Sequence, residues 1–214
     1  MPDDISTQSQ ESVMDAERTA AAKSYDEIYG RAPWLGALHM DSRRVVIQNG
    51  SRPVRLRSLV ALADRVAAEI QPSTPCRRGC NQCCHIAVPV TRTEAKLIGS
   101  RIGVEPAEPR ESTDARAMQH AQFGRPCVFL EDGGCSIYDA RPVSCRLHFH
   151  IGATPAPCDT AAGMTAQANA NLDLSPVFSA YQEITDNSGF ADIRDFFPSG
   201  RVKQPDVDQE PPTA

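Results

Sequence analysis

The clearest hydrophobic pattern in the chain lies between residues 54 and 71. Apolar side chains recur there every three or four positions, with charged side chains between them. The apolar positions are Leu56, Leu59, Val60, Ala63, Val66, Ala67 and Ile70. This period places them on one face of an α-helix, and Pro72 and Pro75 end the pattern. We therefore predict an amphipathic helix whose apolar face packs on a core.

Weaker patterns predict further helices. Residues 11–29 favour a helix but offer little large apolar surface, so we expect a marginal helix there and no regular structure in residues 1–10. Thr91 and Glu94 form a capping-box sequence ahead of an apolar run that ends at Gly103. Additional short helices are predicted at 113–123 and 139–146, and one or two at 159–185.

One segment has the pattern of a β-hairpin. Between Cys127 and Tyr138, residues that favour β-strands lie on both sides of the turn sequence Glu-Asp-Gly-Gly. A cysteine opens each arm of this hairpin. The predicted fold is therefore mainly α with a small β-hairpin.

Charge and composition exclude some classes of protein. The 214 residues include 22 Lys and Arg against 27 Asp and Glu, a net charge of -5, which argues against a nucleic-acid-binding protein. No run approaches the 18 or so apolar residues of a membrane span, and the first residues are acidic and polar without the features of a secretion signal. We expect a cytoplasmic protein with no membrane partner.

The cysteines are the most informative feature of the sequence. All 8 fall between Cys76 and Cys158. A reducing cytoplasm disfavours structural disulfides, so clustered thiols indicate metal binding or redox chemistry. The first group is Cys76, Cys80, Cys83 and Cys84, and the second is Cys127, Cys135, Cys145 and Cys158.

The spacing of the first group suits thiolate ligands on a loop. Cys80 and Cys83 have the separation with which a tight turn brings two thiolates to one metal, and Cys76 adds a third. Such a loop provides three corners of a four-iron cluster or three of four zinc ligands. Adjacent Cys83 and Cys84 do not easily point to the same place, so the full set predicts two four-thiolate sites or one polynuclear site. We expect a compact helical domain built around this cysteine-rich metal site.

The whole pattern resembles the zinc/iron-chelating cysteine-cluster family, the YkgJ-like or CxxxCxxCC proteins. The matching motifs are Cys-Arg-Arg-Gly-Cys-Asn-Gln-Cys-Cys at 76–84, Val-Pro-Val-Thr with Glu94, Cys-Val-Phe-Leu at 127–130, Cys-Ser-Ile-Tyr at 135–138, Arg141-Pro142 and Cys145-Arg146. The family is described by eight cysteines that form a metal site. The resemblance implies that all eight cysteines here are ligands, with Cys158 as the loosest counterpart.

Other residues near the motif are candidates for supporting roles. His85, His148 and His150 are the candidate nitrogen ligands.

Arginines near the motif also have candidate roles. We expect Arg77, Arg78 and Arg146 to offset the negative charge of the thiolates, and Tyr138 with Arg141 to brace the site, where Arg141 pairs with a carboxylate or donates to a metal-bound sulfur.

The predicted function is a metal-binding protein that holds an iron-sulfur cluster or zinc, with redox or electron-transfer service as one role for such a site. Tight clustering of more than four cysteines favours iron-sulfur. Two alternatives are an iron-sulfur enzyme that uses S-adenosylmethionine, similar to flagellin lysine methylase, and a thiol redox sensor at Cys83 and Cys84. The first triplet also has the spacing of radical S-adenosylmethionine enzymes, but a helix precedes it, Gln82 replaces their usual aromatic residue, and no βα units follow.

The predicted organisation has four parts. They are a partly helical N-terminal extension (1–50), the cysteine-cluster metal-binding domain (51–160), a C-terminal helical cover (161–198) and a disordered tail (199–214).

Overall fold

The fold is mainly α-helical with two small strand pairs, which confirms the predicted class. The computed structural model describes residues 3–109, 114–163, 170–186 and 190–200. The helices are α1 (Asp3–Arg31), α2 (Leu38–Ile47), α3 (Arg52–Ile70), α4 (Arg92–Ile102), α5 (Ala115–Gln122), α6 (Val143–Arg146), α7 (Ser175–Ile184) and α8 (Ile193–Phe196). The strands are β1 (Pro89–Thr91), β2 (Leu130–Glu131), β3 (Gly134–Cys135) and β4 (Phe190–Asp192).

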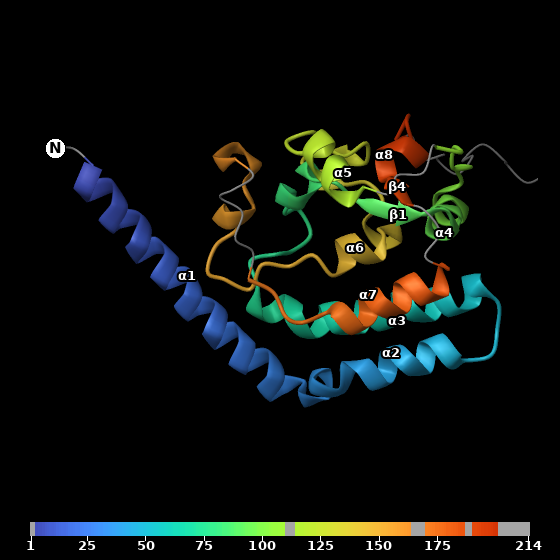
Figure 1. The fold of residues 1–214 in the computed structure, drawn as a ribbon, viewed down its shortest axis with the longest axis horizontal. Coiled ribbons are helices and arrows are strands. Elements are labelled where there is room, and N and C mark those ends of the chain that lie inside the picture. The colour runs from blue at the N-terminus through green and yellow to red at the C-terminus, as the bar shows by residue number, and fades with distance from the viewer. Residues whose placement is uncertain (1–2, 110–113, 164–169, 187–189, 201–214) are drawn as a thin grey trace, which may run out of the picture.

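The elements form two layers with separate cores (Figure 1). Helices α2, α3 and α7 make one layer, and the first core lies among them, α6 and the following segment 147–151. The other layer contains α4, α5, α8 and the β1·β4 pair, and the second core includes residues of α4, β1, β4 and α8. Helix α6 lies between the layers in Figure 1, so the segment that carries Cys145 is held by both.

Helix α3 is the amphipathic helix that the sequence predicts. Its predicted apolar stripe is buried, and Leu56, Leu59 and Ile70 have no exposed surface. A short 3-10 helix at Gln71–Ser73 follows it and contains Pro72. Because the helix ends there, the first cysteine loop begins at a defined point beside the first core.

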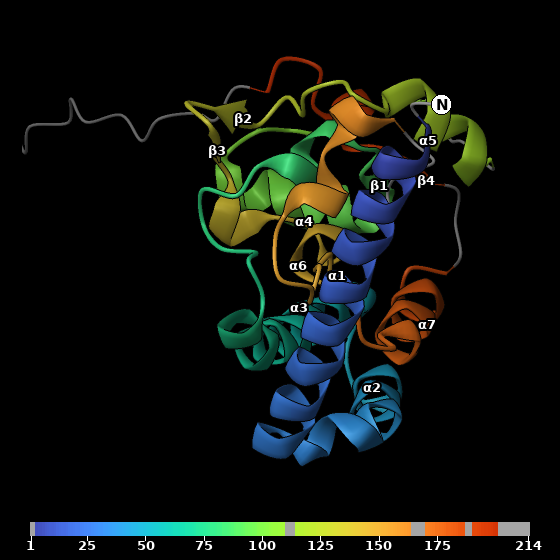
Figure 2. The ribbon, with the colours of Figure 1, turned by 90° about the vertical axis from the view of Figure 1, so that its left-hand side faces the viewer.

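Helix α1 is longer than the sequence suggests. It begins at Asp3, so the expectation of no regular structure in residues 1–10 is wrong from that point. Residues 3–10 contain no glycine or proline, and helix propagation adds a hydrogen bond for each residue fixed. In Figures 1 and 2, α1 ends beside the first turn of α2 and extends from there along one side of both layers. No described helix is long and apolar enough to cross a membrane.

The strand pairs join distant and neighbouring parts of the chain. Strands β2 and β3 form a hairpin at the predicted turn, with Asp132 and Gly133 at positive φ. Its arms are two residues each, so Cys127, predicted to open the first arm, lies outside the strands. Strand β1 pairs antiparallel with β4, which brings the 190–192 segment beside residues 89–91. The region 161–198, predicted as a helical cover, thus also contains a strand. The predicted tail lies outside the described residues from 201 onward.

Candidate metal centre

The first cysteine loop is held by hydrogen bonds to its own backbone. The Cys80 amide donates to the Arg77 carbonyl at 2.9 Å, and the Cys84 amide donates to the Asn81 carbonyl at 2.9 Å. Gly79, at φ 93, supplies the left-handed backbone position inside the first of these turns. These turns, together with the short 3-10 helix Gln82–His85 that carries Cys83 and Cys84, position the first cysteines.

The second group of cysteines reaches the first through two small adjoining pockets. Pocket A, about 60 Å³, is lined by Cys76, Cys80, Cys83, Cys145 and Cys158, together with other residues. Pocket B, about 50 Å³, is lined by Cys80, Cys83, Cys84, Cys127, Cys135 and Cys145, together with other residues. Cys80, Cys83 and Cys145 line both pockets, so cysteines far apart in the sequence share the same walls.

Cys83 and Cys84 point to different surroundings although they are adjacent. Cys83 lines both pockets, whereas Cys84 lines only pocket B. A hydrogen bond from the Cys84 thiol and, to a smaller extent, the charge of Arg141 outweigh the effect of burial and lower the pKa of Cys83 to about 7. The same hydrogen bond raises the pKa of Cys84 well above its usual value. Cys83 is therefore the thiol of this pair that ionises first.

Burial is the main cause of the raised pKa values of the other thiols. It raises the pKa of Cys145 well above the ordinary value, and neighbouring thiols, including Cys83, raise it further. Burial likewise raises the pKa of Cys158 to about 12. Because a metal binds the thiolate, loading such a site releases protons and weakens at low pH.

Arg141 is a cation that lies beside these thiols. It lines both pockets, and its charge lowers the pKa of Cys83, Cys135 and Cys145. Its guanidinium lies 3.8 Å from the centre of the Tyr138 ring. Its Nε atom is buried without a hydrogen-bond partner. A buried, unsatisfied donor beside thiols fits a site whose sulfurs carry negative charge.

The thiols do not form a closed coordination sphere as they stand. Among the described residues, no group of three or more His, Cys, Asp or Glu side chains is close enough to hold a metal ion. The donor set around the pockets still fits zinc or iron, because both metals take several thiolate ligands. Side chains would have to turn toward the ion on binding.

The three candidate histidines have different surroundings. His150 Nε2 lies 3.1 Å from Glu17 Oε2, and His150 Nδ1 accepts from the Ala170 amide at 3.2 Å, so both ring nitrogens are engaged. His85 Nδ1 lies 3.2 Å from the Asn81 carbonyl. His148 lines pocket A, and burial lowers its pKa. Of the three, His148 is the histidine that lines a thiol pocket.

Arg146, a candidate to offset the charge of the thiolates, makes structural contacts. Its guanidinium pairs with Asp64 of α3 and donates to the Asp139 and Arg141 carbonyls. It is buried and ties α3 to the turn before α6. Arg78 pairs with Asp139 at 2.8 Å and stacks on Tyr138, so it braces the same turn.

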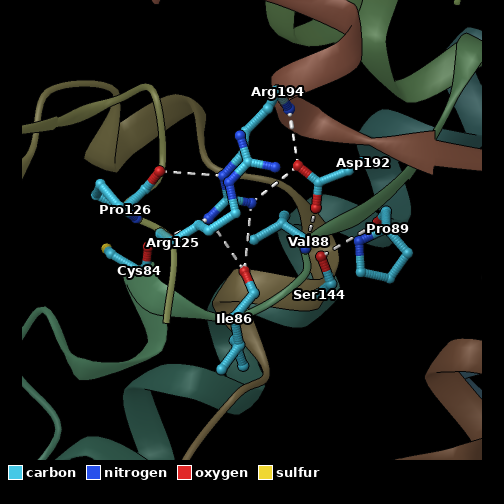
Figure 3. A network of polar contacts seen from close by, with 9 residues as sticks. All are labelled: Cys84, Ile86, Val88, Pro89, Arg125, Pro126, Ser144, Asp192 and Arg194. Atoms are coloured by element: carbon cyan, nitrogen blue, oxygen red, sulfur yellow. Dashed lines mark hydrogen bonds and ion pairs between the residues drawn. The ribbon is translucent and has the colours of Figure 1, made fainter. Parts of the chain in front are cut away.

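A buried ion pair in the C-terminal part supports the loop from outside the cysteine motif (Figure 3). The Asp192 carboxylate accepts from the Val88 amide at 2.8 Å and from the Arg194 guanidinium at 2.8 Å. Arg194 also donates to backbone carbonyls of the cysteine segments, namely those of Cys84, Ile86, Arg125 and Pro126. Sequence reasoning missed this pair because neither residue lies near the motif.

Helix α1 contacts the segment beside the candidate metal centre through Glu17. Its carboxylate accepts from the Ala153 amide at 2.9 Å and from the Thr154 hydroxyl at 2.8 Å, and it contacts the His150 ring. The His150 amide in turn lies 3.4 Å from Cys76 Sγ and donates to it. The N-terminal helix is thus linked to the wall of pocket A.

Comparison with known proteins identifies the cysteine segment. Residues 75–168 match the CxxCxxCC family model, described as "Putative zinc- or iron-chelating domain". This segment is therefore similar to that cysteine-cluster family. The cysteine-cluster domain so defined covers less than half of the 214 residues, and α3, α7, β4 and α8 lie outside it. Searches of curated proteins and of solved structures gave no match.

Proposed function

We propose that the protein binds zinc or iron through the thiolates of its eight cysteines, in two adjoining sites or one polynuclear site. The proposed ligands are Cys76, Cys80, Cys83, Cys84, Cys127, Cys135, Cys145 and Cys158. One observation carries the proposal: cysteines from both halves of the motif line the same pockets, A and B. The family description of the cysteine-cluster domain supports it.

The surroundings of the thiols support a site with negative charge. Arg141 contributes a cation and an unpaired buried N–H at the pockets. Cys83, with a pKa lowered to about 7, provides one thiolate near neutral pH before any metal arrives. We infer that Cys83 is the first ligand to engage the ion, and that the remaining thiols lose their protons as it binds.

The two metals would supply different chemistry. Zinc would link the loop, the hairpin and α6 as a structural tie, whereas an iron-sulfur cluster would add electron transfer. More than four thiols in one place favours the iron-sulfur cluster over a single zinc ion. In either case this chain's part is to hold the ligands and to exclude water from the buried thiols.

Metal analysis of the full chain purified without oxygen tests the proposal. We expect bound metal that survives gel filtration. Brown protein with acid-labile sulfide equal to iron would assign an iron-sulfur cluster, and colourless protein with zinc alone would assign zinc. Native protein that retains neither metal would refute the proposal.

Paired variants test the arrangement of the ligands. Cys76→Ser with Cys158→Ser removes two thiols that line pocket A alone, and Cys127→Ser with Cys135→Ser removes two that line pocket B alone. Two separate sites predict loss of about half the metal from each pair, and one polynuclear site predicts loss of all of it from either. Ser100→Ala, on the exposed face of α4, is the control. If both pairs kept the full metal content, these residues would not be ligands.

A further inference from the structure

Two cavities beside the thiol pockets adjoin each other. One cavity, of about 250 Å³, has walls from β1, α5, α6, α7 and β4. A second, of about 260 Å³, is lined by Cys83, Cys145 and His148 at one end. Pro89, Ser144 and Phe178 line both. The two cavities therefore adjoin, one beside α7 and the other at the wall of the thiol pockets, and we refer to them together as the groove.

Apart from the thiols of Cys83 and Cys145 at its inner end, the lining of this groove carries no formal charge, because neither cavity is lined by Asp, Glu, Lys or Arg. An anionic ligand would lose its hydration there without meeting a cation, which is costly. Phe178, an exposed aromatic residue with 38% of its surface accessible, lies at the junction of the cavities. The groove thus suits an uncharged ligand.

Apart from the exposed Gln182 amide, the side-chain polar groups of the outer cavity are already engaged. The Tyr181 hydroxyl donates to Glu94 at 2.7 Å and accepts from the Thr91 amide at 3.0 Å. The Thr185 hydroxyl donates to the Tyr181 carbonyl at 2.8 Å. Tyr181 therefore offers mainly its ring to a ligand, together with the apolar side chains of Val143 and Phe190. The outer cavity suits the apolar body of a molecule.

The inner cavity offers free polar groups instead. Within the part of the chain that the structure describes, neither ring nitrogen of His148 has a hydrogen-bond partner, and the same holds for the Gln119 side chain. An imidazole provides a donor and an acceptor, and an amide provides both as well. These groups suit a hydroxyl or amide at the inner end of a ligand.

We propose that this groove binds a small neutral molecule with an apolar body and one hydroxyl or amide group, and that His148 and Gln119 receive the polar end beside the thiols. The proposal rests on the proposed metal site only for what the ligand meets at its inner end. Binding itself depends on the groove. The proposal therefore gives the cysteine-cluster domain a small-molecule partner as well as a metal.

Three related probes test the class of ligand. The probes are 2-naphthol, naphthalene and 2-naphthoate, which share a ring system and differ in the polar group. Equilibrium dialysis against the full chain, purified without oxygen, measures each affinity. We expect 2-naphthol to bind most tightly and 2-naphthoate at least about tenfold more weakly. Equal affinity for 2-naphthol and 2-naphthoate, or no binding of 2-naphthol, would overturn the proposal.

Variants locate the binding site. Ala115→Trp places a large side chain in the outer cavity from an exposed position on α5, and we expect it to weaken 2-naphthol and naphthalene by about tenfold or more. His148→Ala removes a hydrogen bond, so 2-naphthol should weaken about tenfold while naphthalene changes less than about twofold. Met40→Ala, an exposed apolar position on α2, is the control. Unchanged affinity in Ala115→Trp would place the probe elsewhere and refute the groove.

The outcome is separable from that of the metal proposal. Metal content and probe binding are measured on the same sample. Suppose that the native protein contains no metal but binds 2-naphthol, and that Ala115→Trp and His148→Ala weaken this binding as expected. The metal proposal would then be refuted and the ligand proposal supported. Metal-loaded protein that does not bind 2-naphthol would support the metal proposal and refute the ligand proposal.

Discussion

Individual buried polar residues in this protein are placed by contacts that the sequence does not reveal. Glu94 is an example. The Thr91 hydroxyl accepts from the Glu94 amide at 3.4 Å, as the predicted capping box requires. The Glu94 carboxylate does not return to the Thr91 amide; it accepts from the Val143 amide at 2.8 Å and from the Tyr181 hydroxyl. The Glu94 side chain therefore connects α4 to α6 and α7 instead of completing the cap of α4.

Glu94 should make the stability depend on pH. Burial raises its pKa from 4.5 to about 7, so the folded protein binds the proton more tightly than the unfolded chain. Its contribution to stability is therefore fully present below pH 4.5 and is lost as pH rises to about 7. Glu94→Gln stays neutral at every pH. We therefore expect its free energy of unfolding to lack the loss of about 3 kcal/mol that the titration of Glu94 causes in the wild type as pH rises. Urea unfolding of both proteins from pH 5 to pH 8, in the same metal state, measures the difference.

The comparison between the two proteins cancels the titration of the thiols, which they share. Parallel stability curves for the wild type and Glu94→Gln would show that Glu94 is ionised in the folded protein throughout.

Gly152 is another residue whose role comes from its surroundings. A Cβ atom at this position would overlap the Glu17 carboxylate and the His150 ring. We expect Gly152→Ala to destabilise the protein by about 1–3 kcal/mol and to loosen α1 from the 150–154 segment. Hydrogen exchange of α1 reports the loosening. Gly30→Ala, in α1 with no atom near the added Cβ, is the matched control and should not destabilise. Equal exchange in all three proteins would contradict the Glu17 contact.

Short elements depend on partners that are distant in the sequence. Strand β4 has three residues and lies beside β1, and α8 follows it directly. Neither element has a long periodic pattern from which a sequence could predict it. Arg194 has 8% of its side chain exposed and Asp192 has none, so their pairing and carbonyl contacts hold these elements against the cysteine loop.

Removing Arg194 should cost much more than removing a surface arginine. Arg194→Met leaves the Asp192 charge buried without its partner and several loop carbonyls without a donor, so we expect a loss of about 3 kcal/mol or more. Arg18→Met, at an exposed ion pair with Asp15, should cost less than about 0.5 kcal/mol. Denaturant unfolding of the two variants gives both values. Similar losses would show that the buried network contributes little.

The molecule as a whole extends well beyond its recognisable motif. The cysteine-cluster domain at 75–168 contains neither α3, which forms much of the first core, nor β4, the partner of β1. It also lacks Asp64, the partner of Arg146. The matched segment therefore depends on both flanks of the chain for its cores.

A fragment limited to residues 75–168 should not fold. Its apolar face from α6 and residues 147–151 would lose α3 and α7, and the edge of β1 would be open. We expect poor dispersion in its proton NMR spectrum and no stable metal binding, whereas the full chain should show a dispersed spectrum. A dispersed spectrum from the fragment would show that the domain folds without its flanks.

The sequence alone determined the local features of this protein. The period of α3, the cap of α4 at Thr91, the turn of the hairpin and the clustering of the cysteines all depend on residues close to one another along the chain. The tertiary structure decided which distant groups meet: the β1·β4 pair, the Arg194 network, the contact of Glu17 with His150 and the shared walls of pockets A and B. Those contacts depend on how separate elements pack, and packing brings together residues that no local period or spacing relates.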